Sequence, residues 1–195
     1  ILQWNIQKDK KLILLPGRLT SWKGQEMFIE ALNLVNQELK QEVFNAVILG
    51  DAQGRDVYKK KLLRLVEQYR LNKQVKFVDH CKHMPLAYKI SNLVVSSSIE
   101  PEAFGRVSVE AQSMEKLIIA SNIGGSNETI INDKTGLLFE SGKPKSLSQK
   151  IIEALKLDDT TLKIMGNEGR KNVIKKFNIE KMCFSTYSEY KKLIN

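Results

Sequence analysis

Two glutamates, Glu102 and Glu110, lie eight positions apart, and Phe104-Gly105 follows closely behind the first of them. A carboxylate has two acceptor oxygens and no donor, which suits a pair of neighbouring hydroxyls on a ribose or hexose. Apolar side chains at helical spacing over 105–115 predict a helix that follows the buried strand predicted at 93–97. The free N–H groups at such a helix end favour phosphate. This segment therefore predicts a site for a nucleotide joined to a sugar.

Two cations, Arg18 and Lys23, follow the first apolar run of the chain after Gly17, where the backbone can turn tightly. Arginine pairs with phosphate bidentately and lysine acts as a compact point charge. Held beside a diphosphate, such cations stabilise the charge that builds on the departing oxygens when the bond to the sugar breaks. The residues alone also allow two surface cations beside a turn, and that alternative stays open.

The order of these segments resembles the retaining glycosyltransferase family 4, also called group 1 glycosyltransferases. The likeness runs from about residue 11 to the C-terminus and matches the family's C-terminal, donor-binding domain in GT-B enzymes. The segments that carry the likeness are Gly17-Arg18-Leu19 with Lys23-Gly24, Glu102 to Glu110, Gly124-Gly125-Ser126-Asn127-Glu128-Thr129, Thr135-Gly136-Leu137-Leu138, Phe177-Asn178 and Tyr187 to Leu193.

The resemblance implies roles for particular residues. It implies that Glu110 binds the ribose hydroxyls, that Glu102 faces the donor sugar, and that Arg18 and Lys23 act with Glu102 in catalysis. The residues expected to contact the donor are Gly17, Gly50, Phe104, Gly105, Arg106, Glu110, Gly124 and Gly125. One departure from the family pattern is the segment Met114-Glu115-Lys116-Leu117, where relatives usually carry a glycine and a proline. The shape of that turn stays open.

Further candidates receive a structural interpretation. Glu100 is interpreted as a charge at the rim of the site, and Glu128 as a residue that orients the glycine loop or starts the following helix. His80, Cys81 and His83 form a single cluster of three possible ligands. No second cluster accompanies it, so we interpret it as a loop beside the nucleotide pocket and expect no metal site.

Apolar runs of strand length alternate with amphipathic segments through most of the chain. This alternation predicts an α/β fold, a Rossmann-like parallel sheet with helices on both faces, followed by C-terminal helices. The strands are predicted at 11–16, 44–49, 75–78, 93–97, 117–120 and 136–139, and the helices at 25–39, 56–71, 85–91, 105–115, 146–157, 160–176 and 179–194. Ligand sites are expected at the carboxyl ends of the strands, where Arg18, Gly50, Glu102 and Gly124 fall.

The net charge of +9 is uneven, because residues 143–195 hold 12 Lys and Arg against 6 Asp and Glu, whereas residues 101–142 hold 3 against 6. The basic excess is either a solvated face or a surface attracted to an anionic membrane or a lipid-linked acceptor. We expect no nucleic-acid partner, because no recognition module is visible and aromatics do not interleave with the basic residues. A dinucleotide oxidoreductase is disfavoured, because Gly17-Arg18-Leu19 stands where G-x-G-x-x-G is needed.

No apolar run approaches the roughly 20 residues that span a bilayer, and residues 1–11 lack the apolar core of a signal peptide. With two cysteines, Cys81 and Cys183, expected to be reduced, these features favour a cytoplasmic protein, or one at the inner face of the membrane. The expected function is transfer of a hexosyl group, with retention, from a UDP- or GDP-linked donor and without a cofactor. Family habit suggests bacterial envelope polysaccharide or lipopolysaccharide as the product. The N-terminal acceptor-binding domain is absent from 1–195, so the chain is expected to be inactive alone; the alternative is a non-catalytic nucleotide-binding module.

Overall fold

The computed structural model describes residue 4, residues 6–7 and residues 9–194. Six parallel strands form one sheet in the order β3-β2-β1-β4-β5-β6. The strands are β1 (Lys11–Pro16), β2 (Phe44–Leu49), β3 (Val75–Val78), β4 (Leu93–Ser96), β5 (Leu117–Ser121) and β6 (Leu137–Phe139). The chain reverses its direction of winding between β1 and β4. In open α/β sheets ligands bind at such a switch point, outside the carboxyl ends of the strands.

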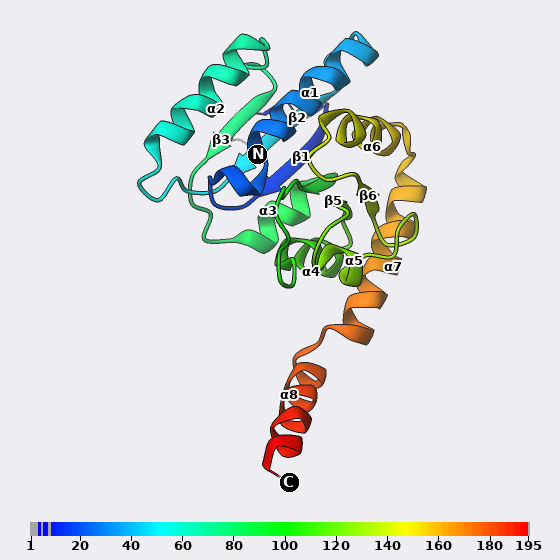
Figure 1. Ribbon diagram of the computed structural model, residues 1–195. Helices are drawn as coiled ribbons and strands as arrows, with labels where there is room; N and C mark the ends of the chain where they lie inside the picture. The colour runs from blue at the N-terminus through cyan, green and yellow to red at the C-terminus, as the bar shows by residue number, and fades with distance from the viewer. Residues whose placement is uncertain (1–3, 5, 8, 195) are drawn as a thin grey trace.

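Helices cover both faces of the sheet (Figure 1). Helices α1, α2 and α6 pack on one face, and α3 and α4 pack on the other, while α7 packs against α4. The helices are η2 (Ser21–Lys23, a 3-10 turn), α1 (Gln25–Leu39), α2 (Asp56–Gln68), α3 (Met84–Ile90), α4 (Arg106–Ser113), α5 (Ser126–Thr129), α6 (Pro144–Lys156), α7 (Asp159–Lys176) and α8 (Ile179–Ile194).

The core has two halves because alternate side chains of each strand point to opposite faces. In β1, Ile13 and Leu15 pack with α1, α2 and α6, whereas Leu12 and Leu14 pack with α3 and α4. Strand β2 is buried over its whole length. Burying one such large apolar side chain stabilises the fold by about 1.5–3 kcal/mol, so the sheet is held firmly between the two layers.

The predicted α/β architecture is confirmed, and most predicted elements lie within two residues of the observed ones. The short helices η2 and α5 were not predicted as elements. Helix α2 ends at Gln68, three residues before the predicted end, and Arg70 takes a left-handed conformation with φ 58°. The open question of the turn after α4 has a specific answer. Glu115 adopts φ 57°, a conformation that favours glycine, and the N–H of Lys116 donates to the carbonyl of Ala111 at 3.0 Å.

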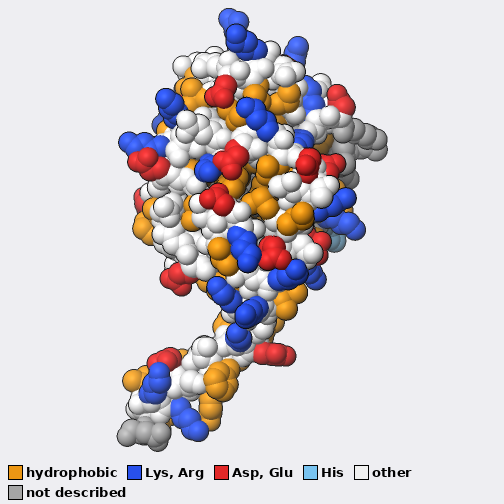
Figure 2. All heavy atoms as spheres, turned by 90° about the vertical axis from the view of Figure 1, so that its right-hand side faces the viewer, with side chains coloured by type: hydrophobic (Ala, Val, Ile, Leu, Met, Phe, Trp, Pro, Cys, Tyr) orange, Lys and Arg blue, Asp and Glu red, His pale blue; other side chains and the backbone are white. Residues whose placement is uncertain are grey.

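Helix α8 leaves the body of the molecule and projects away from it (Figures 1 and 2). None of its described side chains is buried. Large apolar side chains recur along one side of the helix and are mostly exposed: Ile179, Met182, Tyr187, Tyr190, Leu193 and Ile194. No helix in the described part of the chain is both long enough and apolar enough to cross a membrane.

Candidate functional site

A cleft of about 500 Å³ opens at the switch point between β1 and β4. The loop after β1 forms one wall, and the loop after β4 together with the first turns of α4 forms the other. Its lining includes eight of the eleven residues predicted for the site: Gly17, Arg18, Lys23, Glu102, Phe104, Gly105, Arg106 and Glu110. Segments almost a hundred residues apart in the sequence therefore meet in one space of a size common for small-molecule sites.

Lys23 and Glu102 form an ion pair across this cleft, with Nζ 2.8 Å from Oε1. The side chains are 14% and 17% exposed, so solvent screens the pair only partly. The hydroxyl of Ser98 donates to the same carboxylate oxygen, and Nζ of Lys23 lies 4.5 Å from the centre of the Trp22 ring. The carboxylate of Glu102 is thus held in place by a cation and a hydroxyl.

The position of Lys23 depends on the next residue, Gly24. Gly24 has φ 69° and ends the 3-10 turn η2. A Cβ at this position would lie 1.9 Å from the carbonyl oxygen of Ser97, so the turn fits against the loop after β4 only with glycine. The hydroxyl of Ser97 donates to the carbonyl of Lys23 at 2.9 Å. These contacts fix the lysine beside Glu102.

Helix α4 begins at the edge of the cleft, after Gly105 with φ 73°. No side chain caps this N-terminus, so N–H groups of its first turn lack an acceptor within the helix. Phe104 and Val107 also line the cleft at this helix end. The open backbone N–H groups and the dipole of the helix make this part of the cleft attractive to an anion.

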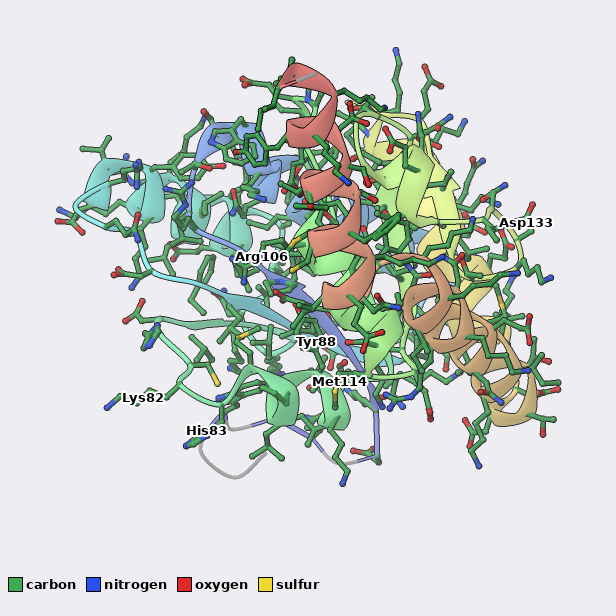
Figure 3. The ribbon with its side chains drawn as sticks, turned by 90° about the horizontal axis from the view of Figure 1, so that it is seen from below. Lys82, His83, Tyr88, Arg106, Met114 and Asp133 are labelled. Carbon is green, nitrogen blue, oxygen red and sulfur yellow. The ribbon has the colours of Figure 1, made fainter. Side chains whose placement is uncertain are left out.

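Glu110 lies one turn further along α4 and has two partners. Its Oε1 lies 3.0 Å from a guanidinium nitrogen of Arg106, and its Oε2 accepts a hydrogen bond of 2.8 Å from the hydroxyl of Tyr88 on α3. Burial, followed by repulsion from the Glu110 carboxylate, raises the pKa of Tyr88. The phenol therefore stays protonated and keeps donating to the carboxylate. Tyr88 and Arg106 both lie towards the centre of Figure 3.

Three predicted glycines, Gly50, Gly124 and Gly125, are not part of the lining of the cleft. A Cβ on Gly50 would lie 1.9 Å from the carbonyl oxygen of Gly17, and a Cβ on Gly124 would lie 2.6 Å from that of Glu102. Gly125 packs in the same way against the backbone of Phe104, and its N–H donates to the carbonyl of Glu102 at 2.8 Å. These glycines allow neighbouring loops to pack directly against each other. A direct contact between them and the donor stays a prediction.

A buried polar network lies beneath the loop that carries Phe104 and connects it to α7. The amide of Gln112 on α4 donates to the carbonyl of Thr129 at 2.9 Å, and Asn172 on α7 donates to the same carbonyl at 3.1 Å. The hydroxyl of Thr129 donates to the carbonyl of Gly125 at 2.9 Å. At the end of α7, the ring of Phe177 meets that of Phe104 edge-on with centroids 5.6 Å apart.

The remaining candidates do not form a further site among the residues that the structure describes. No group of three or more possible metal ligands is present there, and His83 points outward at the edge of Figure 3. Cys81 and Cys183 are both free thiols. Glu100 and Glu128 are exposed.

The family model described as "Glycosyl transferases group 1" matches residues 2–172, which is most of the chain. The chain belongs to the group 1 glycosyltransferases. A glycosyltransferase of Rickettsia africae is 32% identical, with a TM-score of 0.92, over 100% of this chain and 50% of that one. The capsular polysaccharide biosynthesis glycosyltransferase CapM of Staphylococcus aureus is 28% identical over 87% of this chain and 43% of its own length.

A third relative, the HepE protein of Anabaena, has a structure in complex with UDP-glucose. It is 25% identical, with a TM-score of 0.84, over 93% of this chain and 49% of that chain. The chain thus spans about half the length of these relatives.

Sequence reasoning missed six residues that line the cleft and one that holds Glu102: Pro16, Trp22, Met84, Tyr88, Ala103, Val107 and Ser98. Ser98 lies directly after the strand predicted at 93–97, where the sequence assigns it no role. Tyr88 lies in the short helix predicted at 85–91. Its hydroxyl on an otherwise apolar face of that helix was the available sign of a role in the site. Neither residue belongs to a motif: Ser98 acts on Glu102 within the same loop, and Tyr88 acts on Glu110 from a neighbouring helix.

Proposed function

We propose that residues 1–195 form the C-terminal, donor-binding domain of a GT-B glycosyltransferase, whose N-terminal acceptor-binding domain lies outside this chain. The proposed donor is a nucleoside diphosphate sugar linked to UDP or GDP. Its hexosyl group passes to an acceptor with retention of the anomeric configuration. The observation that carries the proposal is the cleft between β1 and β4, where three cations, an open helix end and two held carboxylates line one space. The UDP-glucose complex of the Anabaena relative supports a uridine-linked donor.

In the proposed site the diphosphate lies at the N-terminus of α4, beside Arg18 and Lys23. The bond between the anomeric carbon and the phosphate oxygen breaks, and its electron pair leaves with the phosphate. The acceptor oxygen forms the new bond, and its proton passes to the departing phosphate. Charge therefore builds on the phosphate oxygens, where fixed cations and N–H groups stabilise the transition state more than the ground state. Arg18, Lys23 and Glu102 are the proposed catalytic residues, and the proposal requires no metal or cofactor.

Nucleotide binding tests this proposal directly. Thermal shifts of the chain are measured with UDP, GDP, ADP and their glucose conjugates, with and without EDTA. The shift should be large for one base, should survive EDTA, and should fall in Arg18→Ala and Glu110→Ala. Losing a hydrogen bond to a charged group weakens binding on the order of tenfold or more. Arg64→Ala, an exposed arginine outside the cleft, serves as the control. If no nucleotide stabilises the parent chain, or if both site variants respond like it, the proposal fails.

The alternative function is a non-catalytic nucleotide-binding module. The two functions differ when an acceptor-binding domain is supplied, because only the catalytic domain then turns over a donor. We expect no transfer by the isolated chain and transfer after fusion to the N-terminal half of a relative. Transfer by the chain alone would contradict the proposal, and its absence from every fusion that still binds nucleotide would favour the module.

For the acceptor, we propose a bacterial envelope polysaccharide or lipid-linked precursor, made at the inner face of the membrane. The Staphylococcus relative is a glycosyltransferase of capsular polysaccharide biosynthesis, which supports this class. Figure 2 shows Lys and Arg side chains gathered where the body narrows, and exposed lysines recur from the end of α7 into α8, at Lys175, Lys176 and Lys181. Each contributes about 1 kcal/mol of attraction close to an anionic surface. Sedimentation should show salt-sensitive binding to phosphatidylglycerol vesicles and none to phosphatidylcholine; equal binding to both, or to neither, would remove the membrane contact from the proposal.

A further inference from the structure

A second cleft, of about 610 Å³, lies next to the first and shares Trp22 with it. The 3-10 turn η2 forms one side, and the loop after β2 with the first turns of α2 forms the other. At that loop Gly54 has φ 80°, and a Cβ there would meet nothing within 4 Å, so the entrance is open. The cleft lies outside the set of residues that the proposed function uses for the donor.

The walls of this cleft combine aromatic rings with a cation. Trp22 and Tyr58 provide ring surface, against which the C–H groups of a sugar or polyol can be buried. The hydroxyl of Tyr58 donates to the side-chain carbonyl of Gln25 at 3.2 Å, which fixes the ring. Such apolar surface with a few placed polar groups is typical of small-molecule sites.

Arg55 provides the charge. A guanidinium has five N–H donors, and among the described residues the side chain of Arg55 makes one hydrogen bond, of 3.3 Å, to the carbonyl of Ala52. The other cation of the lining, Lys61, is already paired with Glu26 at 2.6 Å. Arg55 also precedes α2, whose N-terminus has no side-chain cap. An arginine with spare donors beside an open helix end suits a phosphate or carboxylate group.

Two hydroxyl side chains belong to the lining of the cleft, one buried and one exposed. Thr20 is 6% exposed, and its hydroxyl has no hydrogen-bond partner within the described part of the chain. Leaving such a buried group unpaired is costly. Ser21 adds a second hydroxyl beside it. The hydroxyl that a polyhydroxylated ligand in the cleft can reach is that of Ser21, which is exposed.

We propose that this second cleft binds one anionic sugar or polyol portion of the acceptor, with its ring against Trp22 and Tyr58 and its anion at Arg55, while the acceptor-binding domain outside this chain holds the rest. The inference rests on the proposed function. The assignment to the acceptor follows from Trp22, which lines both clefts. Its indole lies against Lys23, the partner of Glu102. The second cleft therefore adjoins the part of the donor cleft assigned to the sugar, where an acceptor hydroxyl must arrive.

Glucose 6-phosphate is a suitable probe because it combines a pyranose ring, hydroxyls and a phosphate. We titrate it into ¹⁵N-labelled chain that is already saturated with UDP, which blocks the donor cleft. The signals followed are the indole N–H of Trp22, identified by its loss in Trp22→Phe, and the amide of Gly54. Glucose and inorganic phosphate serve as probes that each lack one feature. Arg55→Ala is compared with Arg64→Ala, an exposed arginine further along α2.

Glucose 6-phosphate should shift both signals, and its affinity should exceed that of glucose or phosphate. Arg55→Ala should weaken it at least tenfold without changing UDP affinity, while Arg64→Ala should change neither. If UDP binds but glucose 6-phosphate leaves both signals unmoved, or binds Arg55→Ala as it binds the parent, this inference alone is overturned. If UDP itself does not bind, the proposed function fails and the acceptor assignment falls with it.

Discussion

The hydroxyl of Tyr88 donates a 2.8 Å hydrogen bond to Oε2 of Glu110, joining α3 to α4 across the floor of the first cleft. Tyr88→Phe removes only this donor and leaves the ring. The carboxylate then loses the contact that orients it, and we expect about tenfold weaker UDP binding by calorimetry, as for a hydrogen bond to a charged group. Tyr187→Phe, on exposed α8, is the control and should bind as the parent does. Unchanged affinity in Tyr88→Phe would show that Glu110 needs no orientation.

A substitution in the ion pair between Lys23 and Glu102 can distinguish the proposed contacts of the sugar from those of the phosphates. Glu102→Gln removes a negative charge beside the proposed diphosphate site but keeps the shape of the side chain. UDP should therefore bind at least as tightly as before, whereas the preference for UDP-glucose over UDP should fall, because a carboxylate accepts sugar hydroxyls better than an amide. Calorimetry with both ligands measures this ratio. A loss of UDP affinity with an unchanged ratio would place Glu102 at the nucleotide instead.

Asp158 makes stability depend on pH at the start of α7. Its carboxylate accepts a hydrogen bond of 2.7 Å from the N–H of Thr161, which holds the pKa of Asp158 below its ordinary value. A lowered folded-state pKa means that the stabilisation is complete above the unfolded value of about 3.9 and is lost as the pH falls through the folded value. Asp158→Ala should lower the Tm at pH 7, and the difference from the parent should shrink towards pH 3. Asp158→Asn, which keeps the cap but does not titrate, should show a smaller Tm loss at pH 7. If the difference in Tm between Asp158→Ala and the parent is constant with pH, the pH dependence does not come from Asp158.

Gly166 is where α7 meets the turn after α4. A Cβ there would lie 2.2 Å from the carbonyl oxygen of Glu115, which is backbone and cannot rotate away. Gly166→Ala should therefore destabilise the fold by about 1–3 kcal/mol, although alanine favours helix. Urea denaturation measures the change. Asn167→Ala, at the neighbouring exposed position, should be neutral or stabilising; an equal response of the two variants would mean that the contact is not tight.

Helix α8 is expected to contribute little to the stability of the rest of this chain, because no described side chain of it is buried. A chain that ends at Asn178 keeps the contact between Phe104 and Phe177. Its Tm and UDP affinity should match those of the parent, and its solubility should rise with the loss of an exposed apolar stripe. Calorimetry and light scattering test this. A large fall in Tm would show that α8 is held against the body.

The sequence predicted the meeting of Arg18, Lys23, Glu102 and Glu110, because strand ends in a parallel sheet share one edge and the motifs fall at those ends. It could not predict what the glycines approach. At Gly50 and Gly124 the close neighbour is another loop's backbone, which a glycine in the sequence does not distinguish from a phosphate. It also could not predict Tyr88, since its hydroxyl meets Glu110 through the packing of α3 on α4 and not through local spacing.

The contacts from Asn172 to Thr129 and from Phe177 to Phe104 give the far end of the molecule a mechanical connection to the proposed diphosphate site. The first contact is buried, whereas the second lies at the surface, because Phe104 is 45% exposed. Helix α8 begins two residues after Phe177, so whatever holds α8 acts close to the contact with Phe104. In a longer protein, the affinity for the nucleotide would then depend on whether α8 is bound to another part of the protein or free.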